Sequence, residues 1–281
     1  MSDSHYLFKG CLIPTRVPNL EKASLIALDS MGVDHAPFPG ATCCVEPIGL
    51  RSMAADTWLV TVARMLAIAE TDGRDVLTLC NGCYLSFQEA RHALQEPAVR
   101  DQVNLILSSL GREYRGGVKV RHVLDLAHEK GEEGLRDLVR RDLSAFRLAP
   151  HSGCHVLRPS KAGLRESAYA PRMLIDIARW LGSNVVSEEG WPECCGGGIA
   201  SVDEDVSSGI LEDVCSSYRR SGANCILTPC PFCFSQFDLR QKGGLPVLHL
   251  SELLALAFGA TPEEIGLRYH RIKLGPVLGS P

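Results

Sequence analysis

The sequence predicts an α/β protein built from two duplicated domains, each a small, mainly parallel sheet flanked by helices, related by a pseudo-two-fold axis. Ten of the twelve cysteines form one five-cysteine pattern that occurs twice, which indicates an internal duplication. Short β-prone runs alternate with stretches of helical periodicity in both halves, which is typical of parallel sheets. The length of 281 residues also suits two domains of roughly 150 residues each.

Each cysteine set consists of a single cysteine, an adjacent pair and a CxxC motif. The first set is Cys11, Cys43, Cys44, Cys80 and Cys83, and the second is Cys154, Cys194, Cys195, Cys230 and Cys233. The first cysteine of each set follows a glycine, and the first cysteine of each CxxC follows a β-prone run. Only Cys215 and Cys225 lie outside the repeat, and we interpret both as buried, inert thiols.

Periodicity places the expected elements. Helical spacing of apolar residues occurs over 19–31, 56–70, 83–94, 174–181, 203–220 and 250–257. Short β-rich segments occupy 6–9, 76–79, 118–121, 147–150, 225–228 and 246–248. Four of the cysteines directly follow such a strand, where ligands gather in parallel sheets. The adjacent cysteine pairs fall in loops, and glycines around them allow close approach of the backbone to a metal group.

The two domains are expected to span 1–143 and 144–281, the latter with a C-terminal tail. The boundary follows a charged helical stretch over 132–141, for which we expect no packed partner. The first half carries an additional segment, roughly 96–117, without a counterpart in the second.

Composition narrows the functional class. The net charge of −4 without a basic stripe argues against nucleic acid as a partner. No apolar run approaches the roughly 20 residues of a membrane span, and the first residues show no secretory signal. We therefore expect a cytoplasmic protein, in which regularly spaced cysteines bind metal or perform redox chemistry instead of forming disulfides.

Several cofactors remain open from the residues alone. A disulfide scaffold fits poorly, because the chain is not small and cysteine-dense. A zinc ion in each half would use the pair and the CxxC but leave Cys11 and Cys154 unexplained at matching positions. Iron–sulfur ligation is favoured, since soft thiolates are the ligands that such clusters require. Five thiolates exceed the four that a tetrahedral zinc or an ordinary cubane cluster takes.

The motifs also carry a family resemblance. The relevant stretches are Gly10-Cys11 with Pro14 and Arg16, Cys80-Asn-Gly-Cys83-Tyr, Gly153-Cys154-His155 with Arg158-Pro-Ser160, and Leu227-Thr-Pro-Cys-Pro-Phe-Cys233. The five-cysteine set resembles the cysteine-rich CCG domain. Two complete copies resemble the B subunit of heterodisulfide reductase, including its bacterial homologues of the sulfur-oxidation type, over nearly the whole chain.

This resemblance implies two noncubane 4Fe-4S clusters, each held by the five cysteines of one set. The clusters would face each other between the halves, with a disulfide substrate between them receiving one electron from each. The chain would then be an oxidoreductase acting on sulfur groups. His155 is a candidate proton donor, and Arg16 and Arg158 are candidates for binding anionic substrate groups. His122 and His249 occupy equivalent positions, where capping of the following helix is the simpler interpretation.

The resemblance implies partners as well. The chain lacks the cysteine run of a cubane ferredoxin, so it needs an electron-carrying partner of the C type with cubane clusters and a flavoprotein of the A type. The substrate is a small-molecule disulfide or a lipoyl or protein-borne one. The excess of arginine over lysine favours a bacterial sulfur-metabolism complex. Two alternatives remain: an electron-transfer iron–sulfur protein of the complex with catalysis elsewhere, and a zinc-stabilised assembly protein.

Overall fold

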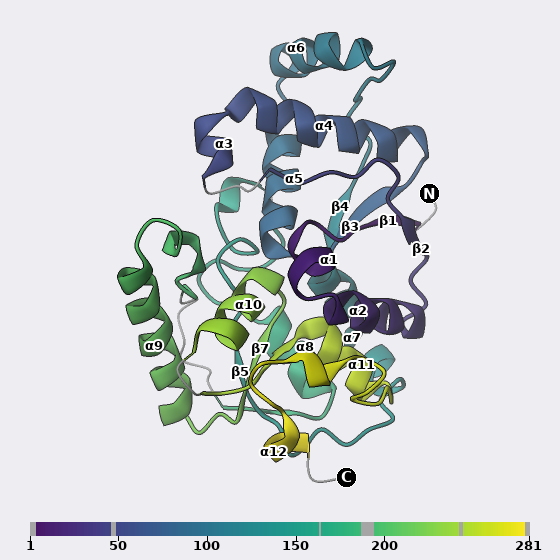
Figure 1. The fold of residues 1–281 in the computed structure, drawn as a ribbon. Helices are drawn as coiled ribbons and strands as arrows, with labels where there is room; N and C mark the ends of the chain where they lie inside the picture. The colour runs from purple at the N-terminus through teal and green to yellow at the C-terminus, as the bar shows by residue number, and fades with distance from the viewer. Residues whose placement is uncertain (1–3, 46–48, 163, 187–193, 242–243, 279–281) are drawn as a thin grey trace.

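The protein consists of two α/β halves that pack against each other (Figure 1). The computed structural model describes residues 4–45, 49–162, 164–186, 194–241 and 244–278. Within these residues, each half contains one four-stranded sheet in which every pairing is parallel. The predicted α/β class and the predicted duplication are both confirmed.

The two sheets have the same strand order. The first contains β1 (His5–Phe8), β2 (His35–Pro37), β3 (Asp75–Thr78) and β4 (Val120–His122), in the order β2-β1-β3-β4. The second contains β5 (Arg147–Pro150), β6 (Asn184–Val185), β7 (Cys225–Thr228) and β8 (Val247–His249), in the order β6-β5-β7-β8. Strands β2 and β6 were not predicted, because these edge strands are only two or three residues long and show no hydrophobic run.

Helices flank both sheets. The first half contains α1 (Leu12–Arg16), α2 (Asn19–Ser30), α3 (Leu50–Met53), α4 (Ala55–Thr71), α5 (Asn81–Ala93), α6 (Pro97–Ser108) and α7 (Val123–Arg136). The second contains α8 (Met173–Trp180), α9 (Glu204–Arg220), α10 (Pro231–Arg240), α11 (Leu250–Ala257) and α12 (Gly275–Leu278). The six predicted helices are confirmed. Helix α6 lies in the additional segment and packs on α4, away from the second half (Figure 1). In the described part of the chain, no helix is long and apolar enough to cross a membrane.

Helix α10 was not predicted, although it holds one CxxC motif. It begins with Pro231, whose fixed φ suits the first turn of a helix. Its aromatic residues Phe234 and Phe237 are fully buried, as are Tyr84 and Phe87 at the matching positions of α5. These rings lie one and four residues after the last cysteine of each set. They anchor both CxxC turns to the core of their own half.

Helix α7 corrects the expectation for the charged stretch over 132–141. The helix begins at Val123 and packs against α8 of the second half. Leu135 is fully buried, and the backbone N–H of Arg140 donates a 2.7 Å hydrogen bond to the carbonyl of Ala257. The expectation of no packed partner was wrong, because the charged side chains cover only the outer face of a helix whose inner face is apolar. The predicted boundary at 143–144 falls in the connection between α7 and β5.

The halves contact each other reciprocally. Helix α2 packs against α11, and α7 packs against α8. In both cases a helix that follows the first strand of one half meets the helix that follows the last strand of the other. Buried hydrogen bonds join α2 to α11: Asn19 Nδ2 donates to Glu252 Oε1 at 2.9 Å, and Ser24 Oγ donates to Ser251 Oγ at 2.9 Å. This reciprocal packing is the arrangement that a pseudo-two-fold axis produces.

Candidate metal centre

All ten cysteines of the two sets line one cavity. The cavity has a volume of about 210 Å³. The cysteines that line it are Cys11, Cys43, Cys44, Cys80, Cys83, Cys154, Cys194, Cys195, Cys230 and Cys233. In each adjacent pair the first cysteine is exposed and the second is buried. The cavity therefore extends from the surface to the packed interior between the halves. Sequence spacing alone did not indicate that the two sets share one space.

The strand ends deliver the cysteines, as predicted. Cys80 follows β3 and immediately precedes α5, while Cys230 follows β7 and immediately precedes α10. Cys11 and Cys154 follow β1 and β5, the neighbouring strands in each sheet. Parallel strands end at the same edge, so each set is gathered at one sheet edge. The N-termini of α5 and α10 favour negative charge on the CxxC sulfurs.

Two equivalent glycines make room for the CxxC sulfurs. Gly10 and Gly153 each precede the first cysteine of a set and have φ values of +67° and +74°. A Cβ atom on Gly10 would lie 2.9 Å from Cys83 Sγ, and one on Gly153 would lie 3.3 Å from Cys233 Sγ. Both positions therefore require glycine for conformation and for space. The backbone comes close to the sulfurs, as expected around a compact metal group.

The sulfurs crowd one another. Cys44 Sγ lies 3.4 Å from Cys83 Sγ. Across the boundary between the halves, the side chains of Cys80 and Cys230 interact, which raises the pKa of Cys80 and lowers that of Cys230. Hydrogen bonds to Cys44 and Cys80, together with burial, raise the pKa of Cys83 well above its usual value.

Burial likewise raises the pKa of Cys154 to about 11. Such thiols bind as thiolates only when a cation compensates their charge, as a coordinated metal does. The all-sulfur donor set fits iron–sulfur groups, and its five members per half exceed what a tetrahedral zinc takes.

Of the three predicted catalytic residues, one lines the cavity and two lie outside its lining. His155 is partly buried and lines the cavity. Arg16, at the end of α1, and Arg158 are exposed, and neither is among the described residues that line the cavity. The charge of Arg158 nevertheless lowers the pKa of Cys154, against the larger raising effect of burial. Lys9 was not singled out from the sequence, yet it lines the cavity and forms a 2.8 Å ion pair with Glu21.

His122 and His249 cap helices, as the simpler interpretation held. Nδ1 of His122 accepts a 3.0 Å hydrogen bond from the N–H of Leu124 at the start of α7. Nδ1 of His249 accepts one of 3.2 Å from the N–H of Ser251 in α11. Both rings are fully buried, and burial lowers the pKa of His122 to about 3. These rings are therefore neutral structural elements at physiological pH.

The two unmatched cysteines lie away from the cavity, as predicted. Cys215 lies in α9 and Cys225 lies in β7, and both are fully buried. Burial raises the pKa of Cys215 to about 12, which keeps its thiol protonated. Neither thiol lines the cavity that holds the other ten.

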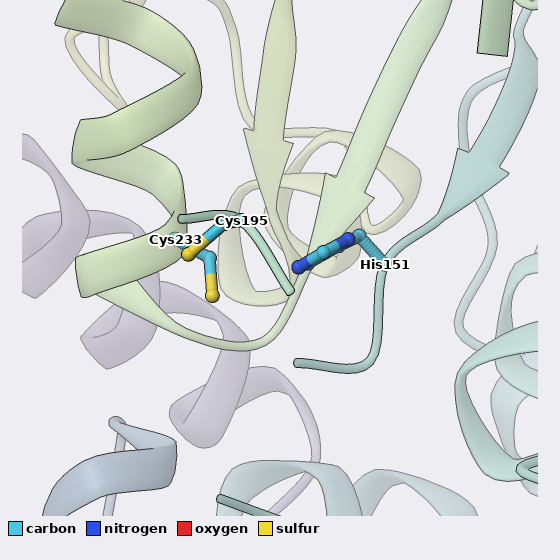
Figure 2. Close-up of side chains that lie close together, drawn as sticks. All are labelled: His151, Cys195 and Cys233. Atoms are coloured by element: carbon cyan, nitrogen blue, oxygen red, sulfur yellow. The ribbon is translucent and has the colours of Figure 1, made fainter. Parts of the chain in front are cut away.

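His151 was not predicted from the sequence but lies beside the second cysteine set. One imidazole nitrogen of this residue and the Sγ atoms of Cys195 and Cys233 all lie within 4.8 Å of one another (Figure 2). His151 follows β5 and is 2% exposed. A signal was present, because His151 stands three residues before Cys154, where the first half has Phe8 before Cys11.

Comparison with known proteins agrees with this geometry. Residues 6–88 and 148–238 match the CCG family, described as the cysteine-rich domain. The B subunit of a CoB-CoM heterodisulfide reductase from Methanosarcina acetivorans is 36% identical over 95% of this chain and 93% of its own length. A protein from Archaeoglobus profundus, named as similar to the heterodisulfide reductase B subunit, is 32% identical over 92% of each chain.

A third relative has a different description. The 8-methylmenaquinol:fumarate reductase membrane anchor subunit from Wolinella succinogenes is 31% identical over 98% of this chain and 100% of its own length. Among solved structures, a hypothetical protein from Helicobacter pylori has a TM-score of 0.77 at 16% identity and supports the fold. The match covers 99% of this chain but 53% of that one. The duplicated cysteine domain and these relatives show that the chain belongs to the CCG-domain family that includes the B subunits of heterodisulfide reductases.

Proposed function

We propose that this chain is the catalytic subunit of a heterodisulfide reductase-like complex, in which it reduces or forms a disulfide. The observation that carries the proposal is the convergence of both five-cysteine sets on one cavity. A substrate in that cavity contacts both halves at once. Relatives named as heterodisulfide reductase subunits, at 32–36% identity over most of the chain, support the same reaction class.

The cysteines divide by half in this proposal. The set that begins at Cys11 would hold one noncubane 4Fe-4S cluster, and the set that begins at Cys154 would hold the other. Such clusters, when bound, supply single electrons, so two of them meet the two-electron requirement of a disulfide. The protein holds the thiolates, excludes water from the buried sulfurs and positions the substrate.

Other residues of the cavity have supporting roles in the proposal. His155 lines the cavity beside Cys154, where its imidazole can deliver a proton to a nascent thiolate. Lys9 lines the same cavity, where its ammonium group could exchange its ion pair with Glu21 for one with an anionic substrate. Arg16 and Arg158 lie outside the lining but are exposed, so we assign them to recruitment of anionic substrate groups.

The proposal includes partner proteins. The relatives are named as subunits, and this chain lacks the cysteine run of a cubane ferredoxin. A cubane-cluster protein of the C type and a flavoprotein of the A type would deliver the electrons in the cytoplasm. The disulfide is a small molecule or a lipoyl or protein-borne group, in keeping with a bacterial sulfur-metabolism complex.

A second candidate function is electron transfer with catalysis elsewhere in the complex. The Wolinella succinogenes relative favours it, because that protein is named as a membrane anchor of a fumarate reductase and aligns over its whole length. Electron paramagnetic resonance separates the two functions. A catalytic cluster that binds the substrate sulfur changes its spectrum when thiol is added, whereas a pure carrier does not.

Metal analysis of protein purified without oxygen tests the proposal first. We expect about eight irons per chain with matching sulfide, which corresponds to two four-iron clusters. Zinc without iron would reject the proposal and favour a zinc-stabilised assembly protein. Iron at the expected level, combined with no spectral response to any thiol, would favour the electron-transfer function.

A further inference from the structure

The two matching sites differ in the residue that stands three positions before the first cysteine of each set. In the first half Phe8 packs edge-on against Phe87, with ring centroids 4.9 Å apart and an interplanar angle of 80°. In the second half His151 packs against Phe237 with values of 4.8 Å and 82°. The imidazole thus takes the place of a phenyl ring. The imidazole adds two nitrogens at the second site and keeps the edge-on ring packing that is found at the first site.

The two nitrogens of His151 have different surroundings. Nδ1 lies 2.9 Å from the hydroxyl oxygen of Tyr218, and both side chains are buried. Nε2 is buried as well and has no hydrogen-bond partner among the described residues. A buried ring nitrogen without a partner is unfavourable unless a bound group satisfies it. The Tyr218 hydroxyl can donate its single proton to Nδ1, which leaves the ring proton on Nε2.

The free end of the ring is directed at the second cysteine set. Figure 2 shows the imidazole extending from the end of β5 toward Cys195 and Cys233. A nitrogen of the ring and both Sγ atoms lie within 4.8 Å of one another. Five cysteines already supply the ligands of this site, so the imidazole is positioned for a hydrogen bond to sulfur.

We propose that Nε2–H of His151 donates a hydrogen bond to a sulfur of the group held by the second cysteine set, and that this bond raises its reduction potential above that of the first. The inference rests on the proposed function, in which each set holds an iron–sulfur cluster. A hydrogen-bond donor stabilises the reduced form of such a group, because that form carries more negative charge on its sulfurs. Phe8 offers no donor at the equivalent place.

This difference gives the two halves distinct electronic roles. An electron that enters the protein is held preferentially in the C-terminal half, beside His155. His151 acts through the sulfurs and is therefore a positioning residue for the redox group. The edge-on packing against Phe87 in one half and Phe237 in the other is kept despite this exchange of ring type.

A redox titration followed by electron paramagnetic resonance tests the inference on the anaerobic holoprotein. In His151→Phe, which copies the ring at Phe8, we expect wild-type iron and sulfide with one midpoint potential shifted to a more negative value. The other midpoint should stay unchanged. Tyr218→Phe removes the partner of Nδ1 and should shift the same midpoint in the same direction by a smaller amount. Phe8→Leu is the matched control in the other half. In this variant, the midpoint potential that shifts in His151→Phe should keep its wild-type value.

The possible failures can be distinguished. Wild-type protein without iron would reject the proposed function itself. Full iron in His151→Phe with both midpoints unchanged would overturn the inference about His151 and leave the proposed function standing. If His151→Phe loses iron, nitrogen-15 labelling of the histidines in the wild-type protein decides. A weak hyperfine coupling between the labelled nitrogen and the electron spin supports a hydrogen bond to sulfur. The strong hyperfine coupling of a nitrogen bound to iron would overturn the inference about His151.

Discussion

Asn81 Nδ2 donates a 2.7 Å hydrogen bond to the backbone carbonyl of Ser152, and thereby joins the CxxC turn of the first half to the cysteine loop of the second. The bond is buried, and Asn81 is 1% exposed. A Cβ atom on Gly153 would lie 2.8 Å from the same nitrogen. This hydrogen bond therefore links the segments that carry cysteines of the two sets.

Asn81→Ala should destabilise the contact between the halves. The substitution leaves the buried carbonyl of Ser152 without a donor, which costs roughly 1–3 kcal/mol. We expect a lower melting temperature for the anaerobic holoprotein. Ser152→Ala is the matched control, because it keeps the acceptor carbonyl and should melt like the wild type. Equal melting temperatures for Asn81→Ala and the control would show that this hydrogen bond does not stabilise the interface.

Gly10→Ala should prevent binding of the iron–sulfur group that we propose for the first half, by steric conflict. Its Cβ would lie 2.9 Å from Cys83 Sγ, at a φ of +67°. Gly73→Ala introduces a similar backbone strain, since Gly73 also has a φ of +67°. Apart from its chain neighbours, however, no atom of the described residues lies within 4 Å of its Cβ. We expect about half of the iron to be lost in Gly10→Ala and none in Gly73→Ala. Similar losses in both would mean that backbone strain, not contact with the sulfur, is responsible.

Cys83→Ala and Cys233→Ala should each abolish disulfide turnover in the assembled complex. Each should also lose about half of the iron, because the proposed function assigns four irons to each set. In the proposed function one site alone would deliver one electron, which does not complete cleavage of a disulfide. The double variant should be no less active than either single variant, since residues acting as one unit are not additive. Substantial turnover in either single variant would refute a reaction that needs both sets.

Cys215→Ser and Cys225→Ala should keep the full iron content. Both thiols are buried outside the cavity. Each substitution should therefore lower only the free energy of unfolding, by about 1–2 kcal/mol. The raised pKa of Cys215, about 12, also predicts that its thiol resists alkylation of the folded protein at pH 8. Iron analysis of the variants tests the first expectation, and mass spectrometry of the alkylated protein tests the second. A large loss of iron in either variant would mean that the ligand set includes that cysteine.

His270 should make the stability depend on pH above about 6.5. Its Nε2 lies 2.8 Å from Glu252 Oε1, and both side chains are fully buried. Burial alone lowers the pKa of His270, but the Glu252 carboxylate outweighs it and raises the pKa. This stabilisation is complete below the unfolded-state pKa and is lost as pH rises through the raised one.

As the pH rises above about 6.5, the melting temperature of the wild type should therefore fall more steeply than that of His270→Gln. Burial lowers the pKa of His122 and His249, so these rings titrate below this range and do not contribute to the slope. Identical slopes for wild type and variant would refute a stabilising pair between His270 and Glu252.

The sequence by itself determined the duplication, the alternation of strands and helices and the ligand candidates. These features rest on local information, because the β-prone run before Cys80 and the helical periodicity after it are properties of adjacent residues. The same holds for Cys230 in the second half. The capping role of His122 and His249 was also local, since each bonds an N–H two residues away.

Only the tertiary structure decided how these parts meet. The contact between Cys80 and Cys230 depends on the packing of α2 against α11 and of α7 against α8, which joins residues far apart in the chain. The approach of His151 to Cys195 and Cys233 likewise depends on a loop and a helix that follow much later in the sequence. Arg16 was a site candidate by its distance from Cys11, yet the folded chain leaves it exposed outside the cavity lining. Spacing along the chain specifies which residues can become ligands, whereas non-local packing specifies which of them share one space.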